Sequence, residues 1–137
     1  MIEFTFFKEP NADQIKPIVE GVVEYGEGLV GTNKPEKYAI QLSLESELIG
    51  GVVGYRQYKR FYLTHIWVSA SYRNRGYGSR LLIETEKTLR NSDCTSIMLE
   101  TLNERAVKLY KQHDYSIVGF IQEYVQGFNL VHMMKEI

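Results

Sequence analysis

Apolar and polar residues alternate most regularly at residues 38–44, and this period of two predicts a half-buried β-strand. Residues 48–55 and 61–68 are two further apolar runs, each reached after a short polar turn, and the second is almost wholly apolar or aromatic, as in a central strand. We therefore predict an antiparallel meander. A β-branched and aromatic run at residues 2–7 predicts another strand. Three glycines of the middle run either weaken this strand or mark close approach of a neighbouring backbone: Gly50, Gly51 and Gly54.

Helical periodicity appears between the run at residues 2–7 and the meander. Apolar residues of the segment 11–26 fall on one face of a helix: Ile15, Ile18, Val19, Val22 and Val23. Asn11 with Gln14 three residues later predicts a capping box at its start, and Gly26 predicts its end. Pro17 has no backbone N–H to donate, so we expect the helix to kink there or to begin there.

The second half of the chain alternates between helical and strand-like segments. These are, in order, a helix at 78–90, a strand at 96–102, a helix at 104–112, and strands at 115–122 and 128–135. The strand–helix–strand unit over residues 61–102 predicts a right-handed parallel crossover. The expected fold class is therefore α/β, with a mostly antiparallel mixed sheet, one parallel crossover and helices on both faces. We predict one domain over residues 1–137.

Composition narrows the function classes. The net charge is −1 and the pI is near 6.3, which argues against a domain built to bind nucleic acid. Cys94 is the only cysteine, so no disulfide forms within the chain, and a reducing compartment is expected. No apolar run approaches the ~20 residues of a membrane span, and the first residues lack a secretory pattern. We expect a cytoplasmic protein without membrane partners.

A polar loop with two glycines joins the central strand to the next helix. The strand ends at Val68, and the helix opens with Gly76 and Gly78. A helix start presents unpaired N–H groups and the positive end of the dipole, which suits a pyrophosphate, and glycine lets a ligand approach the backbone. Three arginines of this segment add positive charge for phosphate contacts: Arg73, Arg75 and Arg80.

Other interpretations of this turn remain open. Glycines and arginines also occur in purely structural loops. A nucleoside-triphosphate loop ends in Gly-Lys-Ser/Thr, which is absent here. A dinucleotide site has three glycines in the first strand–helix unit, whereas this turn has two and lies mid-chain.

The order of elements and the motif together resemble the GNAT family of N-acetyltransferases. That family carries Gln/Arg-x-x-Gly-x-Gly/Ala after its fourth strand, and residues 73–78 (Arg-Asn-Arg-Gly-Tyr-Gly) match every fixed position. The family also has an Asn after the next strand, followed by an Ala and a Tyr on a helix, which Asn103, Ala106 and Tyr110 match. One departure is Asp114, which stands where the family has a glycine.

The resemblance implies a GNAT fold that binds acetyl-CoA as co-substrate and needs no metal. Strand backbone would bind the acetyl and pantetheine arm, the glycine turn would hold the pyrophosphate, and Asn103 would bond the pantetheine or phosphate region. The residues so implied are Trp67, Val68, Arg73, Asn74, Arg75, Gly76, Tyr77, Gly78, Ser79, Asn103, Ala106 and Tyr110.

The same resemblance implies acetyl transfer to a primary amine by direct attack in a ternary complex. This reaction needs a neutral amine and an acid for the leaving thiolate. Tyr110 is the implied acid, although a core aromatic is the alternative. His65 is one candidate base, acting through water, unless it is a satisfied core residue. Glu100 is another, and it would bind the amine, accept its proton or pair with an arginine. Water alone is a further possibility.

Acceptor specificity in this family comes from the first helix, the loop after it and the loop between the last strands. These segments offer acids and aromatics that suit a small cationic amine: Glu24, Tyr25, Glu27, Lys34, Tyr124 and Gln126. We expect a small-molecule acceptor. The alternative is a catalytically inactive acyl-CoA-binding module that regulates or binds another protein. A homodimer through the edge of the C-terminal strands is possible.

Overall fold

The computed structural model describes residues 1–32 and 34–137, and these fall into two compact units, Met1–Lys34 and Pro35–Ile137. The first unit contains the helix α1 (Ala12–Val30). Both arms of the predicted capping box are present, since the Asn11 side chain accepts from the Gln14 N–H at 3.0 Å and the Asn11 N–H donates to the Gln14 side chain at 2.9 Å. The whole-chain domain over residues 1–137 stays a prediction.

Two local predictions for this unit are wrong. The helix starts at Ala12 and continues past Gly26, and it ends only at Gly31, whose φ of 82° is a backbone conformation that glycine adopts readily. A start at Pro17 is therefore excluded, and a kink at that residue stays a prediction. Residues 2–7 form no strand, because a strand needs a neighbour for its backbone hydrogen bonds and residues 1–32 contain none. The apolar stripe of α1 has no buried residue among the described ones.

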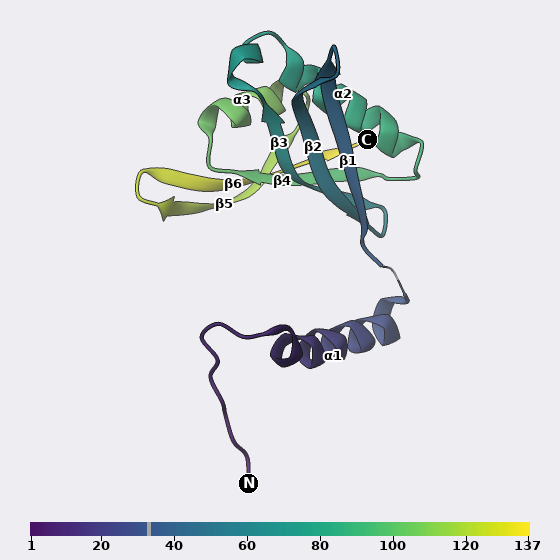
Figure 1. Cartoon of the computed structure of the whole chain (residues 1–137), viewed down its shortest axis with the longest axis vertical. Helices are drawn as coiled ribbons and strands as arrows, with labels where there is room; N and C mark the ends of the chain where they lie inside the picture. Colours follow the sequence, from purple (N-terminus) through teal and green to yellow (C-terminus); the bar gives the residue numbers. More distant parts are fainter. Residues whose placement is uncertain (33) are drawn as a thin grey trace. The chain divides into compact units, whose positions relative to one another are not determined.

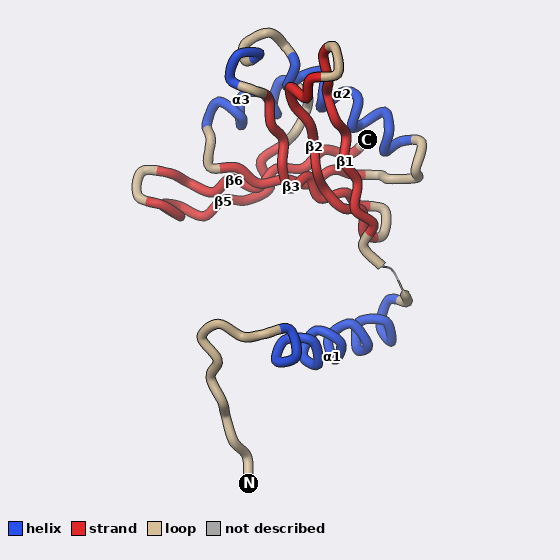
Figure 2. The backbone as a smooth tube through the Cα atoms, in the orientation of Figure 1, coloured by secondary structure: helices blue, strands red, loops and turns tan. Residues whose placement is uncertain are grey.

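The second unit is a six-stranded sheet in the order β1-β2-β3-β4-β6-β5 (Figures 1 and 2). Its strands are β1 (Glu36–Leu44), β2 (Glu47–Gln57), β3 (Arg60–Val68), β4 (Ser96–Thr101), β5 (Ser116–Val125) and β6 (Phe128–Glu136). Every neighbouring pair is antiparallel except β3 with β4. The mostly antiparallel mixed sheet with one parallel crossover, and hence the α/β class, is confirmed.

Two helices and a short 3-10 turn complete this unit. The crossover from β3 to β4 runs through the 3-10 turn (Ala70–Tyr72) and α2 (Tyr77–Arg90), and α3 (Glu104–Gln112) links β4 to β5. Both helices contribute to one core cluster, through Leu82 of α2 and Tyr110 of α3. They therefore bury their apolar faces together, and a helix on the opposite face of the sheet stays a prediction.

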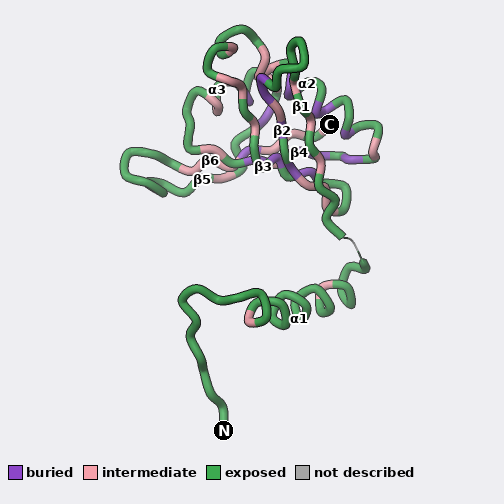
Figure 3. Tube along the Cα trace, viewed as in Figure 1, coloured by how far each residue is buried: buried purple, intermediate pink, exposed green. Residues whose placement is uncertain are grey.

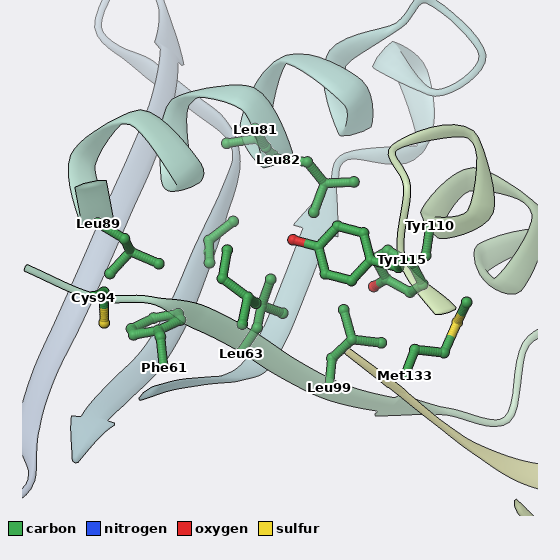
Figure 4. Packing of buried hydrophobic residues seen from close by; sticks show 12 residues of the cluster. Phe61, Leu63, Leu81, Leu82, Leu89, Cys94, Leu99, Tyr110, Tyr115 and Met133 are labelled. Carbon is green, nitrogen blue, oxygen red and sulfur yellow. The ribbon is translucent and has the colours of Figure 1, made fainter. Parts of the chain in front are cut away.

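The core lies where α2 and α3 meet the sheet, and buried segments concentrate there (Figures 3 and 4). Its fully buried side chains include Phe61 of β3, Leu82 of α2 and Ile97 of β4. The predicted close approach at the β2 glycines is confirmed. A Cβ on Gly50 would lie 2.7 Å from the Trp67 carbonyl oxygen. Only glycine lets β2 pass this close to the end of β3.

Candidate active site

The parallel strands β3 and β4 pair only at their beginnings. The paired residues are Arg60 with Ser96, Phe61 with Ile97, and Tyr62 with Met98. Within the described chain, no register pair joins the later residues 63–68 to β4. The two strands therefore diverge and leave backbone groups of β3 without a strand partner on that side. A ligand inserted between the strands can bond to these groups.

A cavity of about 600 Å³ opens at the end of this divergence. It is bounded by the end of β3, the glycine turn, the start of α2 and the start of α3. The lining residues are Ile66, Trp67, Val68, Tyr72, Arg73, Asn74, Gly76, Tyr77, Gly78, Ser79, Asn103, Arg105 and Leu109. The structure thus brings together most of the residues predicted to hold the coenzyme. Arg75, Ala106 and Tyr110 are not among those that line it. We call this space the donor cavity.

The start of α2 presents backbone N–H groups to the donor cavity. Gly76 is the N-cap residue with a left-handed φ of 82°, and it has no side chain to cap the helix. The first N–H groups of a helix have no partner within it, so those of Tyr77, Gly78 and Ser79 are free to bind a ligand. With the helix dipole, they form a site for a phosphate group.

The arginines of the turn have different tasks. Arg73 donates from Nε to the Val68 carbonyl at 2.9 Å, which ties the loop to the end of β3. The Arg75 guanidinium lies 5.6 Å from the centre of the Tyr72 ring. Arg80 lies in the same way over Tyr77, at 5.5 Å. Stacking on aromatic rings holds both charges near the turn without consuming their hydrogen-bond donors.

Two polar contacts brace the donor cavity from the α3 side. The Asn103 side chain caps α3 by accepting from the Arg105 N–H at 2.9 Å. At the other end of α3, His113 Nε2 lies 2.9 Å from the Ser79 hydroxyl of the first turn of α2. The sequence does not predict the second contact, because it joins two helix ends 34 residues apart. It fixes the start of α2 relative to α3.

Tyr110 is a core residue with a raised pKa. Its side chain is 4% exposed, and its ring centre lies 5.6 Å from that of Tyr115 (Figure 4). Burial raises the pKa of Tyr110 to about 12. The phenol therefore keeps its proton at neutral pH, as an acid must. Its role in protonating the thiolate stays a prediction.

A larger cavity of about 1010 Å³ adjoins the donor cavity, because Asn103 and Arg105 line both. Its walls come from the end of β4, the first turns of α3 and the β5–β6 hairpin. The lining residues are Thr64, Glu100, Thr101, Leu102, Asn103, Glu104, Arg105, Val107, Val125, Gly127, Phe128, Asn129, Leu130 and Val131. Its carboxylates and its apolar hairpin wall suit an amine with a sizeable body. We call this space the acceptor cavity.

The two candidate bases differ in position. His65 is exposed, its Nδ1 lies 2.9 Å from the Thr64 hydroxyl, and it lines neither cavity. Glu100 lines the acceptor cavity, and its Oε2 lies 3.3 Å from Nδ1 of His132. His132 was not predicted, because its place opposite Glu100 depends on the register of β4 against β6. An arginine partner for Glu100, one of the alternatives, is absent from the ion pairs of the described residues.

The predicted acceptor residues are divided between the two units. Glu24, Tyr25 and Glu27 lie on α1, in the first unit. Tyr124 lies on β5 beside Val125, is 58% exposed, and does not line the cavity. The roles of these residues, with those of Lys34 and Gln126, stay predictions.

The described residues also bear on a thiol nucleophile, on metal ligation and on membrane spanning. Cys94 is buried, and burial raises the pKa of its thiol, which disfavours the nucleophilic thiolate. Residues 1–32 and 34–137 hold no cluster of His, Cys, Asp and Glu that fits a metal ion. None of the described helices is long and apolar enough to cross a membrane.

Comparison with known proteins decides the family. The family model described as the acetyltransferase (GNAT) family matches residues 6–115. The chain belongs to the GNAT acetyltransferase family. It is 32% identical over 92 residues to the blasticidin-S acetyltransferase of Streptomyces morookaense. The aligned region covers 66% of this chain and 68% of that protein.

Solved structures agree with this assignment at the level of the fold. A crystal structure of an acetyltransferase from Bacillus cereus is similar with a TM-score of 0.88 and 23% identity, covering 97% of this chain and 98% of that one. A protein of Bacillus anthracis assigned as a streptothricin acetyltransferase, solved with acetyl coenzyme A, has a TM-score of 0.67 and 25% identity, covering 76% and 64%.

Proposed function

We propose that this protein transfers the acetyl group of acetyl-CoA to a primary amine of a small molecule. The observation that carries the proposal is the contact between two cavities along Asn103 and Arg105. One cavity ends at a helix start that suits a phosphate, and the other contains the Glu100 carboxylate. Donor and acceptor can therefore be held at once, as direct attack in a ternary complex requires.

The residues of the donor cavity fit acetyl-CoA. The N–H groups of Tyr77, Gly78 and Ser79 would hold the pyrophosphate, and the unpaired edge of β3 at Trp67 and Val68 would hold the pantetheine arm. When bound, acetyl-CoA supplies a thioester carbonyl that an amine can attack. The family relationship and the coenzyme in the Bacillus anthracis structure support this role.

Glu100 is the residue of the acceptor cavity that suits an amine. Its carboxylate would bind the ammonium form and accept a proton from it, which frees the nitrogen lone pair for attack. Tyr110, whose phenol stays protonated, would return a proton to the leaving sulfur. His65, which lines neither cavity, would act only through water.

A small basic molecule is the proposed acceptor. The relative from Streptomyces morookaense is named for blasticidin-S, and the Bacillus anthracis protein for streptothricin. Both are small molecules, and a cavity of about 1010 Å³ has room for one of that kind.

The test is release of free coenzyme A from acetyl-CoA over a broad amine panel, with mass spectrometry of the products. Release with one amine class, together with an acetylated product, would support the proposal and name the acceptor. Release without an acetylated amine would mean hydrolysis, and it would contradict the proposal. A rise in melting temperature with acetyl-CoA, but no product from any amine, would favour the inactive binding module instead.

Tyr110→Phe separates chemistry from binding. An enzyme that uses the phenol as its acid should lose turnover of the identified amine while it keeps acetyl-CoA affinity, because the ring and its packing against Tyr115 remain. Unchanged turnover would remove Tyr110 from the mechanism and leave the transfer itself intact.

A further inference from the structure

Glu100 and His132 face each other across two antiparallel strands. They are register partners in the β4–β6 pair, so their side chains emerge on the same face of the sheet. His132 Nδ1 lies 3.3 Å from Glu100 Oε2. Within the described residues, His132 is the one basic side chain with a nitrogen within 4 Å of a Glu100 carboxylate oxygen. This pairing uses one carboxylate oxygen and leaves Oε1 for another partner.

Glu100 also stands at a boundary between two spaces. A smaller cavity of about 310 Å³ lies beside the acceptor cavity, and Thr64 and Glu100 line both. His132 lines only the smaller one, with Tyr55, Tyr62 and Met98 among its other walls. The histidine therefore reaches Glu100 from the side away from the acceptor cavity, and a molecule in that cavity can reach the carboxylate without displacing it.

The surroundings of the pair explain why a positioning contact matters. The Glu100 side chain is 58% exposed and that of His132 is 41% exposed, so neither is fixed by burial. Other charged groups at the acceptor cavity are Glu104 and Arg105, which come from α3. Without His132, the Glu100 carboxylate would be free to rotate among solvent-exposed rotamers, and its orientation toward a bound amine would be lost.

We propose that His132 is a positioning residue that aims Glu100 at the acceptor amine. This inference rests on the proposed function. The Nδ1–H of the ring attracts Oε2 across 3.3 Å, and Oε1 takes a proton from the ammonium group. The N–H bond breaks as the O–H bond forms, and the freed nitrogen pair attacks the acetyl carbon. The nitrogen then loses its second proton to water, the C–S bond breaks, and the sulfur takes a proton from Tyr110. Water reprotonates the phenol, and the proton on Glu100 passes to water.

The first test compares two substitutions of His132 in the full chain. Asparagine places an N–H close to the position of Nδ1 but cannot titrate, whereas alanine places nothing there. We expect His132→Ala to lower kcat/KM for the amine about tenfold, with the acetyl-CoA Kd unchanged, and His132→Asn to recover to within about twofold of wild type. Glu136→Gln, an exposed change on the same strand, is the control and should match wild type.

Several results would overturn the proposal. It fails when His132→Ala stays within about twofold of wild type, or when His132→Asn is as slow as His132→Ala. It also fails when the fold losses in kcat/KM of Glu100→Gln and His132→Ala multiply in the double variant. A residue that only positions Glu100 should have no further effect on kcat/KM once that carboxylate is gone. A wild-type protein that acetylates no amine would instead sink the proposed function, and this inference with it.

A second readout needs no substrate. Nitrogen NMR of the imidazole in the free protein reports which ring nitrogen carries the hydrogen of the neutral form. We expect the Nδ1–H tautomer at His132 in wild type, and a shift toward the Nε2–H tautomer in Glu100→Ala. The same tautomer in both proteins would show that Glu100 does not orient the ring, and the positioning role would fall.

Discussion

The two glycines of the turn at residues 76–78 are conformationally different, and exchanging each for alanine separates their roles. Gly76 has a φ of 82° and ψ of 6°, and a Cβ built there meets nothing within 4 Å. The whole cost of Gly76→Ala is therefore backbone strain. A side chain in the left-handed region costs roughly 1–2 kcal/mol, so we expect the free energy of unfolding to fall by that amount.

Gly78 lies in the first turn of α2, and its φ is not in the left-handed region. A Cβ there would lie 3.3 Å from Leu109 Cδ2, a flexible side-chain end that can move by a few tenths of an ångström. Alanine is also the better helix former by up to about 1 kcal/mol. The two terms oppose each other, so we expect Gly78→Ala to change stability by less than about 1 kcal/mol, in either direction.

Urea denaturation of the two variants and of Gly76→Asn tests this reasoning. Asparagine tolerates the left-handed region better than alanine and can cap the helix, so it should recover at least half of the alanine loss. Calorimetric titration with acetyl-CoA then shows whether the turn keeps its affinity. A Gly76→Ala protein as stable as wild type, or a Gly76→Asn protein no better than Gly76→Ala, would refute the assignment of the cost to φ.

The remaining predictions concern the core. Lys135 Nζ lies 3.0 Å from both carboxylate oxygens of Glu86, whose side chain is 7% exposed. Lys135→Met leaves this buried carboxylate without its lysine, and we expect the free energy of unfolding to fall by about 2–3 kcal/mol. The loss is smaller than for a fully unpaired charge because Arg90 also lies near Glu86. Adding Glu86→Gln should recover part of this in urea melts, and a purely additive further loss would contradict the pairing. Burial raises the pKa of Tyr110 to about 12, whereas a tyrosine in the unfolded chain ionises at a pH of about 10. Because the unfolded chain loses this proton first, we expect stability to decline as the pH rises from about 10 to 12. Tyr110→Phe should flatten part of that decline in thermal melts at pH 9 to 12, and an unchanged slope would exclude the residue as its source. Cys94 should resist a thiol reagent until urea unfolds the chain, because it is buried, and rapid labelling of native protein would argue against that burial.

Local patterns in the sequence predicted the meander, the crossover and the glycine turn. Each of these depends on residues close together in the chain: alternation at residues 38–44, an apolar run at 61–68, and two glycines two positions apart. The capping box at Asn11 succeeded for the same reason, since both of its hydrogen bonds close within three residues. Short-range hydrogen bonding and periodicity can be predicted from such patterns.

Features that depend on distant partners were not predictable. The run at residues 2–7 has strand-forming composition, yet composition does not supply a neighbouring strand. His132 faces Glu100 only because of the register of β6 on β4, and the Ser79–His113 contact depends on how two helix ends meet. Glu100 was predicted as a candidate, but the histidine beside it required the sheet.

The Asn103 cap restricts what its side chain can recognise. Its carbonyl oxygen already accepts the Arg105 N–H, and its own backbone N–H already donates to the Thr101 hydroxyl at 3.0 Å. The amide NH₂ has no partner among the hydrogen bonds of the described residues, so it is the group of Asn103 that can donate to a ligand in either cavity. A ligand atom that meets this NH₂ must be an acceptor, such as an amide carbonyl or a phosphate oxygen, whereas a ligand donor could bind only at the remaining lone pair of the carbonyl oxygen.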